Sequence, residues 1–167
     1  MPSSHFKEQL AFGAKGEARV LKSLLDSGKF ELVSDGNDNS FHDFEVVTIR
    51  HVFRVEVKDE SRYANSQNLC LEMYQGPKGF PSGILKSGAT ITVHLMGDAC
   101  RLYRTNEMQV LLTNVFEKHN QYPVKLMEKS DNMNKGMVIP ISRFRNQYTW
   151  FDEKHLSELP ESKLWMF

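Results

Sequence analysis

Asp43-Phe-Glu-Val-Val-Thr-Ile-Arg-His-Val-Phe-Arg-Val-Glu56-Val-Lys58 is the stretch that decides the fold. Its apolar and β-branched residues predict two strands, 44–49 and 52–58, joined by a tight turn. Because side chains two apart in a strand share a face, Glu56 and Lys58 point to one side and the alternating apolar residues point into a core. The hairpin therefore brings one carboxylate, that of Asp43, beside a second carboxylate and an ammonium group.

The polar groups of this hairpin predict a site for a divalent cation. The carboxylates of Asp43 and Glu56, with the backbone carbonyl of Val57, supply the hard oxygen ligands that Mg²⁺ prefers. Lys58 beside them would orient or help deprotonate the attacking water and offset charge in the transition state. We therefore predict Mg²⁺-dependent hydrolysis of phosphodiester bonds, with Mn²⁺ as a substitute metal.

A predicted N-terminal helix, 13–25, supplies a third candidate carboxylate. Apolar residues recur in it at helical spacing, and Ser27-Gly28 follows as a helix C-terminus should. Glu17 falls within the apolar stripe, which leaves two interpretations. It is either a boundary carboxylate paired with a lysine or arginine, or a side chain over the metal site that holds a second metal or a metal-bound water.

The order of these groups along the chain carries a resemblance to a known family. A helix glutamate comes first, then Asp43, then Glu56-Val-Lys58, and then a strand with Glu72 that is followed by Pro81-Ser-Gly-Ile84. Glu-x-Lys alone arises often by chance, and the complete ordered set is more specific. The set resembles the PD-(D/E)xK nuclease superfamily, most of all its small phage-type and Holliday-junction-resolvase-like members.

The resemblance covers residues 17–96 and departs from the namesake motif at His42, which stands where a proline would precede the aspartate. It implies a restriction-endonuclease-like α/β fold, with a central mixed sheet of about five strands flanked by helices. The whole chain would form one domain, with a recognisable core over 13–104 and a C-terminal extension over 105–167.

The resemblance also implies an activity. Related proteins are DNA endonucleases of recombination and repair, often phage-encoded, that leave 5′-phosphate and 3′-hydroxyl ends, and a helix glutamate leans over their metal site. This favours the second interpretation of Glu17. Because a four-way junction needs two symmetric cuts, a resolvase-like protein is expected to be a homodimer.

Glu72 is a further candidate site residue. It lies in a predicted strand, 69–74, whose alternation places three apolar side chains on one face and Glu72 on the other. The side chain then either shares the active-site side with Glu56 or is an ordinary exposed glutamate.

The segment after that strand is too rich in glycine and proline for regular structure. Ser82 in it would cap a short helix, 84–89, whose first amide groups would form an anion site close to DNA. An ordinary turn is the alternative. Lys86 in this segment and Arg54 in the hairpin are additional candidates for contact with DNA.

The rest of the chain predicts further elements of the same fold. Arg143 and Arg145 interleave with aromatic residues near the C-terminus, which is typical either of nucleic-acid contact or of a core edge with solvated arginines. His94 is expected to be a packed or satisfied histidine. The expected elements are strands over 30–33, 90–96, 99–103 and 137–141, the last at a sheet edge because of its proline, helices over 105–116, capped at Thr105 or Asn106, and 152–159, and a loop over 119–136.

Composition narrows the class of protein. The 167 residues are 40% hydrophobic and carry no net charge, which fits one domain with a core and argues against a protein that coats nucleic acid non-specifically. Cys70 and Cys100 lie in apolar surroundings, so neither a disulfide framework nor a zinc site is expected. Without a long apolar run, we expect no membrane contact and an intracellular, cytoplasmic protein.

Two alternatives to the nuclease stay open on the sequence alone. The chain could be a catalytically inactive nuclease-fold protein that binds nucleic acid or regulates, or a structural protein in which Glu56 and Lys58 form a surface ion pair. Within the nuclease hypothesis, the sequence does not distinguish DNA from RNA, or a junction from a flap, a duplex or a single strand.

Overall fold

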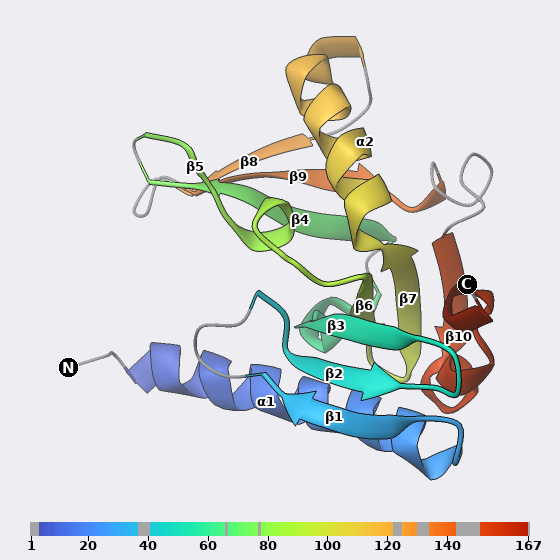
Figure 1. Cartoon of the computed structure of the whole chain (residues 1–167). Coiled ribbons are helices and arrows are strands. Elements are labelled where there is room, and N and C mark those ends of the chain that lie inside the picture. The colour runs from blue at the N-terminus through green and yellow to red at the C-terminus, as the bar shows by residue number, and fades with distance from the viewer. Residues whose placement is uncertain are drawn as a thin grey trace.

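The computed structural model describes residues 4–36, 41–65, 67–76, 78–121, 125–129, 134–142 and 151–166. This part of the chain forms an α/β fold with two sheets (Figure 1). The larger sheet has six strands in the order β1-β2-β3-β6-β7-β10, and the smaller has four in the order β5-β4-β9-β8. The predicted α/β class with a mixed sheet is confirmed, but it has six strands where about five were expected, and the second sheet was not expected.

The six-stranded sheet contains the predicted hairpin at its centre. Its β3 and β6 run parallel, and all other neighbours in it run antiparallel. The Thr48 amide donates to the His51 carbonyl oxygen at 2.9 Å and closes the turn between β2 and β3. The strands are β1 (Glu31–Asp35), β2 (Phe44–Val47), β3 (Val52–Asp59), β6 (Ile91–Met96), β7 (Ala99–Arg104) and β10 (Phe151–His155).

The helix α1 (Ser4–Asp26) covers one face of this sheet (Figure 1). Val20 and Leu24 are fully buried against the apolar side chains of the strands. The helix ends where the sequence predicts, because Gly28 takes a left-handed conformation (φ 67°) that other residues rarely adopt. It begins earlier than the expected residue 13, since the apolar stripe marks only its packed portion.

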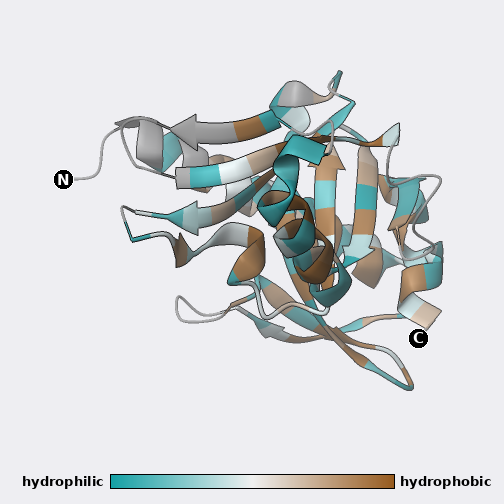
Figure 2. Cartoon of the chain, turned by 90° about the horizontal axis from the view of Figure 1, so that it is seen from above, coloured by the Kyte–Doolittle hydropathy of each residue, from teal (hydrophilic) through white to brown (hydrophobic). Residues whose placement is uncertain are grey.

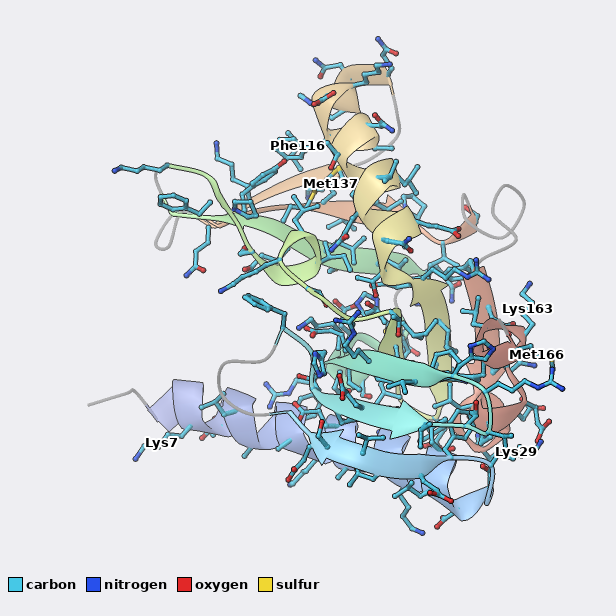
Figure 3. The ribbon with its side chains drawn as sticks, viewed as in Figure 1. Lys7, Lys29, Phe116, Met137, Lys163 and Met166 are labelled. Carbon is cyan, nitrogen blue, oxygen red and sulfur yellow. The ribbon has the colours of Figure 1, made fainter. Side chains whose placement is uncertain are left out.

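The second sheet carries its own apolar core under a second helix. Leu69, Leu71 and Met73 are buried on one face of β4, as their alternation predicts. Figure 2 shows the helix α2 (Thr105–Glu117) crossing this region, and Figure 3 labels Phe116 and Met137, which belong to the same apolar cluster. The strands are β4 (Asn68–Gln75), β5 (Phe80–Pro81), β8 (Lys125–Lys129) and β9 (Asn134–Pro140).

Two predictions about this sheet were wrong. Much of the expected loop 119–136 belongs to β8 and β9, which pair as a hairpin. Their charged residues are typical of a loop, but an outer strand needs few apolar side chains and can have the same composition. β9 was expected at a sheet edge, but it lies between β4 and β8. Pro140, which has no amide hydrogen to donate, is tolerated because pairing with β8 ends at Val138.

The C-terminal helix expected over 152–159 is absent from the described residues. Residues 151–155 form β10, which pairs with β7, and the 3-10 helices η4 (Leu156–Glu161) and η5 (Lys163–Met166) follow. The exposed edge of β7 offers backbone partners that outweigh a short helical pattern. Trp165 then packs into the core and donates from Nε1 to the Leu159 carbonyl oxygen at 2.8 Å.

Two expected helix caps were also wrong. α2 begins at Thr105, and its N-cap is Arg104, whose side chain makes no capping hydrogen bond. Thr105 is buried and its hydroxyl lies 2.8 Å from the Thr92 hydroxyl. The helix expected over 84–89 is only the 3-10 turn η2 (Gly83–Leu85), and Ser82 stands at its N-cap position without a capping hydrogen bond from its side chain.

Both cysteines are free thiols. Among the helices of the described residues, none is long and apolar enough to cross a membrane.

Candidate active site

The hairpin brings Asp43 to the β3 residues named by the sequence. The Asp43 amide donates to the Val55 carbonyl oxygen at 2.9 Å, which extends the β2–β3 pairing by one residue. Asp43 Oδ2 in turn accepts a hydrogen bond from the Val57 amide at 2.6 Å. The carboxylate is therefore fixed against the peptide that separates Glu56 from Lys58.

Glu56 and Lys58 form an ion pair on one face of β3, as their spacing predicts. The Glu56 side chain is 12% exposed and the Lys58 side chain 43% exposed, so the ammonium group reaches toward solvent from a buried partner. Burial acts to lower the pKa of Lys58, but Glu56, Asp43 and Glu72 outweigh it and the pKa is raised. Lys58 is consequently held as a cation among carboxylates.

The three predicted carboxylates lie within electrostatic reach of one another. Burial first, and then the charges of Glu56 and Glu17, raise the pKa of Asp43 to about 7, against the opposing effects of the Val57 amide and Lys58. The pKa of Glu17 is raised as well, by burial and by Glu56. The structure thus places Glu17 beside the site, and crowded carboxylates of this kind repel one another in the absence of a cation.

A close helix crossing positions Glu17. A Cβ atom added at Gly16 would lie 2.7 Å from both Cβ and Oδ2 of Asp59, the residue that follows Lys58 at the end of β3. Only a residue without a side chain permits this approach of α1 to the end of β3. Sequence reasoning missed Gly16, although a glycine inside an otherwise regular helix is a signal for close backbone packing.

The donor chemistry of the site fits Mg²⁺, although the ligands are not gathered. Asp43 and Glu56, with the Val57 carbonyl, supply the oxygen atoms that this cation takes. In the part of the chain that the structure describes, however, no three His, Cys, Asp or Glu side chains are grouped closely enough to hold a metal ion. A cation bound among the carboxylates would relieve their mutual repulsion.

Glu72 approaches the site from the second sheet. It contributes to the raised pKa of Lys58, and its Oε1 accepts a hydrogen bond from Ser82 Oγ at 2.8 Å. Ser82 therefore anchors Glu72, and the predicted role as a helix cap beside an anion site is wrong. The adjoining Gly83 has φ 49°, and a Cβ atom there would lie 2.5 Å from the Glu72 carbonyl oxygen.

A cavity of about 210 Å³ lies between the two sheets, behind Lys58. His94, the β6 partner of Lys58, is fully buried there, and burial and nearby cations lower its pKa to about 3. His94 Nε2 lies 3.3 Å from the Tyr103 hydroxyl, and Nδ1 has no hydrogen-bond partner among the described residues. The cavity is lined by Lys58, Cys70, Leu71, Glu72, Gly83, Ile84, Thr92, His94 and Tyr103.

Glu60, in the polar segment expected to end the hairpin near the site, is half-buried and has a pKa shift that the sequence did not predict. Burial raises its pKa to about 7, against the effects of the Cys70 amide, which bonds it, and of the Arg101 charge. It follows β3 directly and links that strand to β4. The only sequence signal was its place in the polar run from Lys58 to Arg62 that follows the apolar part of β3.

The remaining candidates differ in their positions. Arg54 is exposed two residues before Glu56, so its side chain leaves β3 on the same face. Lys86 is exposed, and its Nζ lies 5.5 Å from the centroid of the Phe41 ring, in the segment that leads to Asp43. The residues around Arg143 and Arg145 fall outside the described residues.

Comparison with known protein families, with curated proteins and with solved structures finds no match for this chain.

Proposed function

We propose that this protein is a metal-dependent endonuclease that hydrolyses phosphodiester bonds in DNA. The observation that carries the proposal is the hydrogen bond from the Val57 amide to Asp43, which holds one carboxylate between Glu56 and Lys58. Glu17 adds a further carboxylate from α1, and burial together with the charge of Glu56 raises the pKa of both Glu17 and Asp43. A strand pair that needed only stability would have little reason to bury repelling carboxylates together.

Asp43, Glu56 and the Val57 carbonyl oxygen would hold Mg²⁺, and Glu17 would hold a second ion or an ion-bound water. A divalent cation in such a site lowers the pKa of bound water and neutralises charge on the phosphate. The chain's own contribution is to fix the ligands. The Val57 amide orients Asp43, the close approach of α1 at Gly16 positions Glu17 beside the site, and Glu56 projects from β3.

Lys58 has a separate role in the proposed reaction. Its ammonium group is anchored by Glu56 and reaches solvent, so it can contact both a water molecule and a non-bridging phosphate oxygen. It would orient the water for attack and offset the charge that develops on the phosphate. Glu56 contributes most to the raised pKa of Lys58, and Asp43 and Glu72, the latter held by Ser82, add to it.

The resemblance of the ordered motif to phage-type and Holliday-junction-resolvase-like nucleases supports DNA as the substrate, structure-selective cleavage, and ends that carry 5′-phosphate and 3′-hydroxyl groups. It likewise supports a homodimer, since two symmetric cuts resolve a junction. We include these finer properties, and action inside the cell, in the proposal.

The first experiment is cleavage of a labelled panel that contains a four-way junction, a flap, a linear duplex and a single strand. Each is incubated with Mg²⁺, Mn²⁺ or EDTA, using wild type, Lys58→Ala and a matched control, Lys22→Ala. Lys22 is an exposed lysine on α1 that pairs with Asp26 away from the site. We expect metal-dependent cleavage by wild type and the control, and a loss of about 10²-fold or more in Lys58→Ala.

One observation favours a second candidate function. Because the described residues include no preformed group of three metal ligands, the chain could be an inactive nuclease-fold protein that binds nucleic acid. This candidate predicts tight binding of one member of the panel, no cleavage with either metal, and no effect of Lys58→Ala on the products. That set of results would replace the nuclease proposal.

A further inference from the structure

A large aromatic side chain is exposed immediately beside the carboxylates. Phe41 precedes Asp43 by two residues, so about 7 Å of chain at most separates their Cα atoms. Its side chain is 54% exposed, whereas Phe44 on the same segment is 2% exposed and belongs to the core. Other apolar side chains are exposed as well, Phe80 and Ile49 among them, and Phe41 differs from them by its position two residues before Asp43.

The ring is not on a free loop, because the segment before β6 holds its backbone. The Phe41 carbonyl oxygen accepts hydrogen bonds from the Gly88 amide at 2.8 Å and from the Ser87 hydroxyl at 3.2 Å. A Cβ atom added at Gly88 would lie 3.2 Å from the Phe41 Cβ, so the two segments touch. The exposed ring is therefore presented at a set place relative to Asp43.

Cations accompany aromatic rings on both sides of the carboxylates. Lys86 Nζ lies 5.5 Å from the centre of the Phe41 ring. On the α1 side, the Arg62 guanidinium lies over the Phe12 ring at 4.5 Å, and Arg62 is exposed. Arg62 follows the end of β3, where Asp59 meets α1. Exposed aromatic rings paired with cations are the combination that stacks bases and holds phosphates of a single strand.

We propose that Phe41 is a stacking platform for an unpaired nucleobase next to the bound phosphate, and that Lys86 contacts the adjoining backbone phosphate. The inference rests on the proposed function, which places the phosphate at Asp43. In a duplex both faces of every base are covered by its neighbours, so a phenyl ring can stack only on an unpaired or terminal base. The substrate class is then DNA with unpaired nucleotides, such as a flap, a strand end or an opened junction.

Binding without cleavage tests this inference. Affinities for a fluorescein-labelled single strand and for a duplex of the same sequence are measured by anisotropy in EDTA. The variants are Phe41→Ala, Phe41→Trp and Ile49→Ala. Ile49 is the matched control, because it is a fully exposed apolar residue at the opposite end of the β2–β3 hairpin.

Phe41→Ala should weaken binding of the single strand by about 10-fold or more, and binding of the duplex by less than about 2-fold. Phe41→Trp should retain affinity, and its added tryptophan emission should be quenched by the single strand more than by the duplex. Ile49→Ala should change neither affinity. Lys86→Ala should weaken both and reduce the salt dependence by about one unit of slope.

Equal losses for single strand and duplex in Phe41→Ala, unchanged binding, or no binding of DNA by wild type would each overturn the inference. These outcomes are separable from a failure of the nuclease proposal. A protein that cleaves DNA but binds equally with and without the Phe41 ring refutes only the platform. A protein that never cleaves DNA, yet loses single-strand selectivity in Phe41→Ala, refutes only the nuclease.

Discussion

The Val57 amide donates a hydrogen bond of 2.6 Å to Asp43 Oδ2, and this contact holds the Asp43 side chain against the β3 segment that carries Glu56 and Lys58. The bond favours the charged form of Asp43, but burial and neighbouring carboxylates prevail and raise the pKa to about 7. The hydrogen bond thus fixes the position of the carboxylate but does not keep its pKa low. Removal of the Asp43 charge should therefore stabilise the folded protein.

Asp43→Asn should make the metal-free protein more stable at pH 8. The unfolded chain loses the Asp43 proton near its ordinary pKa of 3.8, while the folded protein retains it to about pH 7. Folded stability therefore falls as pH rises through this window, and wild type carries the full penalty above it. Urea unfolding in EDTA should show a gain of about 1 to 4 kcal/mol for the variant at pH 8, which vanishes near pH 4. A variant less stable than wild type at both pH values would contradict the crowding of charges.

Mg²⁺ should reverse that order of stability. A cation that binds only the folded state stabilises it by about 2.7 kcal/mol when its concentration is one hundred times the dissociation constant. Wild type should gain thermal stability on addition of Mg²⁺, and Asp43→Asn should gain little. Differential scanning fluorimetry across a Mg²⁺ series measures this, with Glu31→Gln, an exposed β1 carboxylate outside the site, as the control. An equal gain in wild type and Asp43→Asn would exclude Asp43 as a ligand.

Gly16→Ala should lower both stability and activity. The new Cβ would lie 2.7 Å from Asp59, so the helix must retreat from β3 and carry Glu17 with it. We expect a loss of about 1 to 3 kcal/mol in unfolding free energy. The matched control is Gly13→Ala, one turn earlier, where the nearest atom is Glu17 Oε1 at 3.8 Å and where the change should stabilise the helix by up to about 1 kcal/mol. Equal effects of the two substitutions would contradict the close crossing.

His94→Gln should make the protein more resistant to mild acid. The unfolded chain takes up a proton at His94 below its ordinary pKa of 6.5, whereas the folded protein, through burial and the nearby cations Lys58 and Arg101, resists protonation to about pH 3. The contribution of neutral His94 to the free energy of unfolding is complete above pH 6.5 and decreases as the pH falls toward 3. Wild type should therefore lose about 2 to 3 kcal/mol more than the variant between pH 7 and pH 4.

The acid series has its own control. His155→Gln replaces an exposed histidine whose Nδ1 lies 2.8 Å from the Ser157 hydroxyl, and acid unfolding of this variant should follow that of wild type. If His94→Gln followed the wild-type curve as well, then His94 would not be held neutral by its surroundings.

More of the candidate site than of the surrounding fold could be predicted from the sequence. Strand periodicity is local, so the hairpin and the side on which Glu56 and Lys58 lie follow from adjacent residues. Glu17 required the additional knowledge of how α1 crosses β3, and only the steric demand at Gly16 records that crossing. Glu72 was placed near the site, but the prediction did not include a second sheet, because nothing in β4 itself reveals that its partner is β9.

The misassigned segments share one physical cause. β8 and β10 are short outer strands whose stability comes from backbone pairing with distant residues, and backbone groups carry no sequence signal. Ser82 was assigned to a helix for a related reason. Its hydroxyl could cap a helix or bind another side chain, and it donates to Glu72, ten residues earlier.

The pairing of β4 with β9 has a consequence for the order in which the protein folds during translation. Asn68 pairs with Pro140, so the sheet that walls the cavity behind Lys58 cannot close until the chain has been synthesised to about that point. The hairpin of β2 and β3 is local and can form much earlier. A nascent chain on the ribosome would therefore carry Asp43, Glu56 and Lys58 in place but without Glu72 and Ser82 behind them. The arrangement of both sheets around these residues would therefore be completed only late in translation.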